Sequence, residues 1–140
     1  MKTLKAIVMG VALLFVGAVS QAAPAGHNLS KEEVLDTYLN AVVHGKITGI
    51  EDAIDDDATF YMKRGGNVNT LTKSQIVSAL KSSENLEQDC KCTKTIIQDD
   101  DDISKVKVEM KYNDFTRVDV ITTTHSGSKW LITSVETSYK

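Results

Sequence analysis

The chain has 140 residues and a formal net charge of -3, with 41% hydrophobic and 25% charged residues. This length suits one domain with a single core. Its basic residues are scattered, which excludes the basic stripe of a nucleic-acid-binding protein, and its single proline and eight glycines argue against a disordered linker.

Residues 1–22 have the order of a secretory signal peptide. Lys2 and Lys5 form a basic start, residues 6–19 are uncharged and apolar, and small residues follow up to Ala22. The apolar run is too short to span a bilayer. We therefore predict cleavage near Ala22, a secreted or periplasmic protein, and no membrane span in the mature chain, which is two units more negative without its two lysines.

Two helices are predicted next. Ser30 and Glu33 form a capping box that begins a helix over residues 30–44. Apolar residues then follow at helical spacing, and Gly45 suits the left-handed cap that ends a helix. A second, shorter helix is predicted over residues 48–54, ended by three aspartates.

The rest of the chain is rich in strand patterns. We predict a strand at residues 58–63, a turn at 65–67 and a return strand at 68–71. Thr72 and Gln75 form a second capping box, which opens another helix. Further strands are predicted at residues 88–98, 103–112, 115–124 and 129–139.

The long strands indicate the fold class. Val106, Val108, Met110 and Tyr112 alternate with charged residues, so one strand face is apolar and must be covered by helices. Meandering strands favour an antiparallel sheet with one solvated face. The sequence thus predicts an α+β fold in the order α-α-β-β-α and then three or four strands, with a curved antiparallel sheet wrapped around the N-terminal helices and a cavity at its open end.

Four segments resemble the nuclear-transport-factor-two-like superfamily. They are VLDTYL at residues 34–39, HGKITGI at 44–50, DDDATF at 55–60 and SKWLITSV at 128–135. The resemblance spans residues 30–139 and is strongest to the exported bacterial group described as “Putative lumazine-binding” and to SnoaL-like proteins. It implies one cone-shaped domain at residues 30–140, after a lead-in at 23–29, and a homodimer.

The superfamily includes ketosteroid isomerase, and its catalytic residues can be compared with this chain. Tyr38 falls where the isomerase has its oxyanion-hole tyrosine. The general-base aspartate falls on Met62, and the second oxyanion donor, a protonated aspartate, falls near Val120. A methionine cannot take a proton from carbon, which argues against this chemistry. Tyr61 or Asp57 would replace the base only if the strand register differed by one residue.

The functional prediction follows from that missing base. We predict an exported domain that binds a small apolar or aromatic ligand in the cone, acts as a homodimeric scaffold, or both, and needs no cofactor. The alternative is an isomerase, cyclase or dehydratase that uses Tyr38 with Asp57 or Tyr61. Ordinary core packing competes with a ligand role for every candidate. The predicted cavity residues are Tyr38, Tyr61, Met110, Tyr112, Thr116 and Trp130.

Two further clusters have a less specific meaning. Cys90 and Cys92 are candidates for a disulfide in an exported protein, although a ring this small strains the bridge and an intermolecular bridge is the alternative. The aspartates at residues 99–102 lack the spacing of an EF-hand, so we predict a solvated hairpin tip and no metal site.

Overall fold

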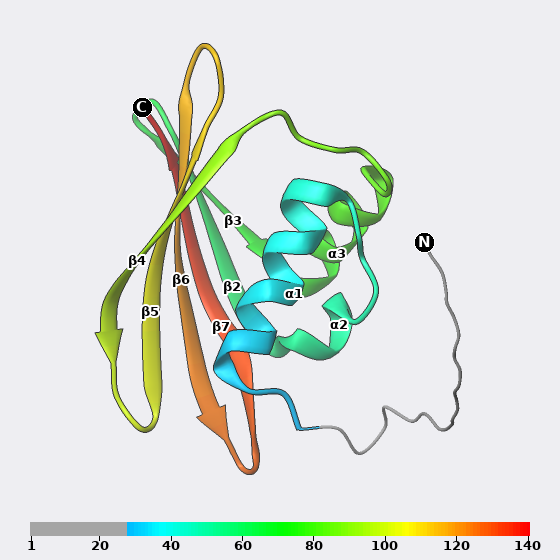
Figure 1. Ribbon diagram of the computed structural model, residues 1–140, viewed down its shortest axis with the longest axis vertical. Coiled ribbons are helices and arrows are strands. Elements are labelled where there is room, and N and C mark those ends of the chain that lie inside the picture. The colour runs from blue at the N-terminus through cyan, green and yellow to red at the C-terminus, as the bar shows by residue number, and fades with distance from the viewer. Residues whose placement is uncertain (1–27) are drawn as a thin grey trace, which may run out of the picture.

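The computed structural model describes residues 28–140, which form one curved, open sheet with helices on one face (Figure 1). The predicted signal peptide and most of the predicted lead-in lie outside the described residues. Within the described part, no helix is both long and apolar enough to cross a membrane.

The elements confirm the predicted α+β class, with four strands after the third helix. The helices are α1 (Lys31–His44), α2 (Ile50–Ala53) and α3 (Lys73–Ser82). The strands are β2 (Ile54–Arg64), β3 (Asn67–Thr72), β4 (Lys91–Asp99), β5 (Ile103–Lys111), β6 (Thr116–Ser126) and β7 (Lys129–Tyr139).

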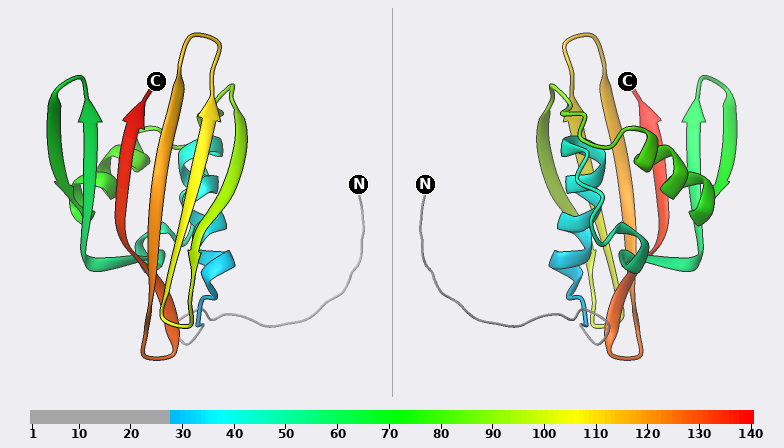
Figure 2. Two further views of the ribbon diagram at one scale, coloured as in Figure 1. Left: turned by 90° about the vertical axis from the view of Figure 1, so that its left-hand side faces the viewer. Right: turned by 90° about the vertical axis from the view of Figure 1, so that its right-hand side faces the viewer.

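The six strands are arranged in the order β3-β2-β7-β6-β5-β4 (Figure 2). Neighbouring pairs are antiparallel except β2 and β7, which are parallel. The antiparallel pairs follow each other in sequence, so short turns can join them. β2 and β7 are far apart in sequence, and they become neighbours only when the whole sheet has assembled.

Three elements, α2, β2 and β4, differ most from their predicted bounds. α2 has only four residues, because Gly49 before it is left-handed (φ 81°) and Ile54 after it is already extended (φ -111°, ψ 130°). The aspartates at residues 55–57 therefore belong to β2 and do not separate a helix from a strand. β4 begins at Lys91, since the backbone N–H of Gln88 donates to Val43 outside the sheet.

Both predicted capping boxes are present, and the first fixes where α1 begins. The Ser30 hydroxyl accepts from the Glu33 N–H at 3.1 Å, and the Glu33 carboxylate accepts from the Ser30 N–H at 3.3 Å. α1 ends at left-handed Gly45 (φ 67°), where an added Cβ would lie 2.6 Å from the Asn85 backbone nitrogen. Only glycine allows the segment after α3 to pass this close.

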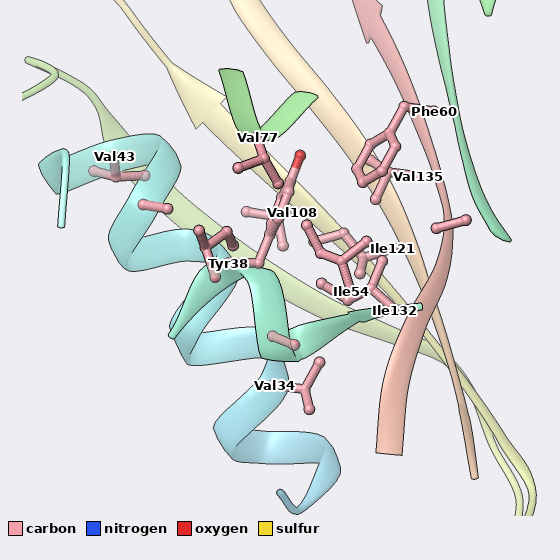
Figure 3. Packing of buried hydrophobic residues seen from close by; sticks show 14 of the residues in the cluster. Val34, Tyr38, Val43, Ile54, Phe60, Val77, Val108, Ile121, Ile132 and Val135 are labelled. Atoms are coloured by element: carbon pink, nitrogen blue, oxygen red, sulfur yellow. The ribbon is translucent and has the colours of Figure 1, made fainter. Parts of the chain in front are cut away.

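The core lies between α1 and the sheet (Figure 3). We call the helix-covered side of the sheet its inner face and the other side its outer face. Val108 and Met110 of β5 and Ile121 of β6 are almost fully buried on the inner face. Each such side chain stabilises the fold by about 1.5–3 kcal/mol. From α1 the buried residues are Val34, Tyr38, Ala41 and Val43.

Candidate functional site

A pocket of about 280 Å³ lies on the inner face, between the first turns of α1 and strands β4, β5 and β6. The start of α1 shares this end of the molecule with the β4–β5 and β6–β7 hairpins (Figures 1 and 2). Its apolar lining residues are Leu35, Ile96, Val106 and Ile121. Its polar lining residues are Lys31, Glu32, Lys94, Asp99, Ser104 and Thr123.

The pocket exists because small side chains stand where larger ones fill the sheet elsewhere. Farther along β5, Val108 and Met110 are fully buried against the core. Ser104 occupies the same face of β5 at the pocket, opposite Thr123 of β6. β4 is an edge strand that the helices cover poorly, and its Ile96 is 67% exposed. Space therefore remains between this corner of the sheet and α1.

The two lysines at the rim of the pocket each lie beside a carboxylate, and Glu32 adds a further carboxylate to the lining. Lys31 forms an ion pair with Asp99, and Lys94 lies 3.7 Å from a carboxylate oxygen of Asp36. The Lys31 ammonium also lies 5.4 Å from the centre of the Trp130 ring. These rim lysines are already compensated by carboxylates, so they do not form an obvious anion site.

The two hydroxyl-bearing residues that line the pocket differ from the rim charges because they are buried. Ser104 is 6% exposed and Thr123 is 4% exposed. The two residues are direct partners in the β5–β6 ladder, and both line the pocket. Within residues 28–140, neither hydroxyl has a hydrogen-bond partner.

A second polar group lies deeper on the inner face, centred on Asp119. Its carboxylate is fully buried and accepts from the Tyr38 hydroxyl at 3.1 Å and from the Thr137 hydroxyl at 2.7 Å. The Arg117 guanidinium donates two bonds to the same carboxylate, both at 3.0 Å. Asp119 lies two residues from Ile121 on the same strand face, so this cluster adjoins the floor of the pocket.

The electrostatics of this cluster hold Tyr38 and Arg117 in fixed protonation states. Burial, reinforced by the charge of Asp119, raises the pKa of Tyr38 well above its ordinary value. Burial acts to lower the pKa of Arg117, but the neighbouring Tyr38 and Asp119 outweigh it and the pKa is raised. Tyr38 thus stays neutral and Arg117 stays cationic at any ordinary pH, which suits a structural cluster.

This geometry shows which residue lies near the predicted position of the second oxyanion donor of ketosteroid isomerase. The residue that meets Tyr38 is Asp119, next to the predicted position Val120. The sequence carried a signal for it, because an acidic residue interrupts the apolar alternation of β6. Met62, at the general-base position, pairs with Thr137 in the β2–β7 ladder. Tyr38 is 2% exposed and its hydroxyl is already engaged.

The other predicted cavity residues are dispersed over the molecule. Met110 is buried in the core, and Tyr61 is half-buried on the outer face beside Glu136. Tyr112 stacks on Phe115 with ring centres 4.6 Å apart, and its hydroxyl donates to Gln88.

The last three candidates also lie outside the lining of this pocket. Thr116 lines an outer-face hollow of about 300 Å³. Trp130 stacks on His125 and lies against Lys31, which lines the pocket. Asp57 is exposed in an acidic hollow of about 350 Å³. The lining of the 280 Å³ pocket includes none of the six predicted cavity residues. A ligand role for them stays a prediction.

The cysteines are free thiols in this structure, with Cys90 half-buried and Cys92 exposed. Burial, together with the nearby Cys90, raises the pKa of Cys92, and the same two causes raise the pKa of Tyr112 to about 12. A disulfide between them stays a prediction. Among residues 28–140, no three His, Cys, Asp or Glu side chains are grouped so as to hold a metal ion.

Comparison with known families agrees with the fold. A sequence profile of the family described as “Putative lumazine-binding” matches residues 30–138. The chain belongs to this family. The predicted nuclear-transport-factor-two-like (NTF2-like) superfamily is confirmed, while no curated protein sequence matches the chain.

Solved structures show the same fold at low sequence identity. An NTF2-like protein of unknown function from Silicibacter pomeroyi is 17% identical with a TM-score of 0.64, over 76% of this chain and 90% of that one. An NTF2-like protein from Cytophaga hutchinsonii is 16% identical with a TM-score of 0.60, over 76% of this chain and 93% of that one. At such identities these similarities establish the architecture alone.

Proposed function

We propose that this domain binds a small, mostly apolar ring compound in the pocket between α1 and strands β4, β5 and β6. The observation that carries the proposal is the mainly apolar lining of this pocket, to which Leu35, Val106 and Ile121 contribute. Small-molecule sites are typically concave and mainly apolar, with a few polar groups that fix orientation.

The pocket limits the size of the ligand. Its volume of about 280 Å³ is near the lower end of known ligand sites, and a cavity of about 150 Å³ already holds benzene. A compound of one or two fused rings therefore suits the space. Lumazine, the compound that the family description names, is a two-ring heteroaromatic molecule and is a reasonable first probe.

Two substitutions of the same kind test the location of binding. Val106 lines the pocket on the inner face of β5, whereas Val118 lies on the outer face of β6. Lumazine, naphthalene and 2-naphthol would be titrated into each protein and followed by amide NMR. We expect Val106→Phe to weaken binding by at least about ten-fold, because the ring fills the pocket, and Val118→Phe to leave it unchanged. Equal effects of the two variants would contradict the proposed site.

The enzymatic alternative receives less support from the site. Tyr38 donates its hydroxyl to Asp119, and that carboxylate already accepts from Arg117 and Thr137. A base must reach the substrate proton, and Met62 at that position has none to offer. We therefore assign the Asp119 cluster a structural role next to a binding pocket.

Export and dimerisation remain part of the proposal. The signal-peptide pattern of residues 1–22 supports secretion or a periplasmic location. Ile96 and Ile97 on edge strand β4 are 67% and 53% exposed, and a second copy of the chain would cover them. Native mass spectrometry of protein exported from a bacterial host reads both features. A mass that still includes residues 1–22 would argue against export with cleavage. An Ile97→Lys variant that is still a dimer, like the parent protein, would argue against dimerisation through β4.

A further inference from the structure

Two residues that line the pocket carry hydroxyl groups with no partner among residues 28–140. Ser104 and Thr123 are 6% and 4% exposed, so solvent barely reaches them. The other buried threonine among the described residues differs: the hydroxyl of Thr137, 1% exposed, donates to Asp119 at 2.7 Å. Buried polar groups without a partner cost free energy and are uncommon in folded proteins. Such groups in an open pocket indicate that a partner comes from outside the chain.

We propose that Ser104 and Thr123 form a polar subsite that binds one uncharged hydroxyl, carbonyl or amide group of the ligand. This inference rests on the proposed pocket and adds the chemical class of its occupant. The ligand is then an apolar ring compound with one polar substituent, whose ring contacts Leu35, Val106 and Ile121.

The geometry allows both hydroxyls to meet the same ligand group. The two residues face each other directly across the antiparallel β5–β6 ladder and share the inner face. Cα atoms of such partners lie about 5 Å apart. Each hydroxyl can donate one hydrogen bond and accept others. A carbonyl oxygen can therefore accept from both, and a hydroxyl or amide can donate to one while it accepts from the other.

The charges around the subsite favour an uncharged group. Lys31 and Asp99 at the rim form an ion pair with each other, and Lys94 is beside Asp36. Glu32, which also lines the pocket, would repel an anionic ligand group. Ser104 and Thr123 carry no charge that would compensate an ionised ligand group in this buried position. Burial of an uncompensated charge is far more costly than burial of a neutral hydroxyl.

A pair of probes isolates the contribution of one ligand hydroxyl group to the binding affinity. Naphthalene and 2-naphthol share the same rings and differ by one hydroxyl group. We expect 2-naphthol to bind the full protein roughly ten-fold more tightly than naphthalene, as two hydrogen bonds allow. In the variant Ser104→Ala/Thr123→Val this ratio should fall to near one, with naphthalene binding unchanged. The amide NMR shifts of residues 104 and 123 locate both probes.

The possible results separate this inference from the proposed function. If both probes bind in the pocket and their ratio is the same in the parent and the double variant, the polar subsite is wrong and the binding pocket stands. If neither probe shifts the pocket amides of the parent protein, the proposed function fails and this inference fails with it.

A measurement without ligand provides a second test. Thr123→Val removes a hydroxyl that has no partner, so we expect an unchanged or higher melting temperature. Thr137→Val removes the same group where it donates to Asp119, so we expect a lower melting temperature. An equal loss in the two variants would mean that Thr123 already has a partner in the free protein, which would overturn the inference.

Discussion

Two polar groups on the inner face of the sheet, only a few residues apart on β6, differ in how well the protein satisfies them. In the deep cluster, Asp119 is fully buried and accepts hydrogen bonds from Tyr38, Arg117 and Thr137. In the pocket, Ser104 and Thr123 are nearly as buried and, among the described residues, have no partner. The comparison teaches that polarity inside the cone serves two purposes: the deep cluster holds the fold together, and the pocket remains available to a ligand.

The difference arises from the cover that α1 provides. Tyr38 comes from the middle of α1 and reaches the sheet with its hydroxyl (Figure 3), so it closes over Asp119. At the start of the helix, Leu35 and Lys31 line the pocket. The leucine side chain has no polar atom, and Lys31 donates to Asp99, so the helix supplies no partner for the two hydroxyls. The same helix therefore seals one part of the inner face and leaves another part open.

Among the variants considered, Asp119→Ala should cause the largest loss of stability. It leaves the buried Arg117 guanidinium and the Tyr38 and Thr137 hydroxyls without their acceptor. We expect the free energy of unfolding to fall by about 3–5 kcal/mol, as when one member of a buried ion pair is removed. Urea unfolding followed by circular dichroism measures it. A loss below about 1 kcal/mol would mean that the cluster is not structural.

Tyr38→Phe should lower the stability by less than Asp119→Ala, and it should also change how the stability depends on pH. At neutral pH we expect a loss of about 1.5–3 kcal/mol, because the hydroxyl bonds to a carboxylate. The pKa of Tyr38 is raised in the folded protein, so its contribution is complete below the unfolded tyrosine pKa of about 10. Above that pH the folded state binds more protons than the unfolded state, and stability falls as pH rises, by roughly 1 kcal/mol per pH unit.

The variant gives the control for that pH dependence. Tyr38→Phe has no group to titrate at this position, so its stability should decline less steeply above pH 10 than that of the parent protein. The gap between the two proteins should therefore narrow with rising pH. A gap that stays constant would contradict the raised pKa of Tyr38.

Ser30→Ala tests how the start of α1 shapes the pocket. Loss of this cap should cost about 1 kcal/mol and should also weaken probe binding, because Lys31 and Leu35 of α1 line the pocket. Thr72→Ala is the matched control: it removes the same kind of cap from α3, away from the pocket. We expect a similar loss of stability from Thr72→Ala with probe binding unchanged, measured by thermal unfolding and amide NMR titration.

Asp99→Asn should have the smallest effect on stability. Its ion pair with Lys31 lies at the rim, with the Asp99 side chain 50% exposed, whereas the Asp119 side chain is fully buried. Exposed ion pairs are weak and are screened by salt. We expect no resolvable shift in the urea midpoint at physiological salt. A loss comparable to that of Asp119→Ala would show that the two ends of the inner face do not differ as described.

The sequence by itself determined most of the local structure. Capping boxes at Ser30 and Thr72 and the left-handed Gly45 depend only on neighbouring residues, and all three are present. The alternation of β5 fixed which face is apolar, since successive strand residues point to opposite faces. These local signals, with the superfamily resemblance, were sufficient for the α+β class.

Tertiary structure alone decided the parallel pairing of β2 with β7 and the composition of the two polar groups. Arg117 and Asp119 meet Tyr38 and Thr137 only after α1 lies across the sheet. Ser104 and Thr123 become a pair only through the β5–β6 register. Whether a polar side chain finds a partner depends on segments far apart in sequence. The residue type at one position does not tell which of these segments will lie beside it. For this reason the residues that line the pocket between α1 and the sheet could not be read from the sequence alone.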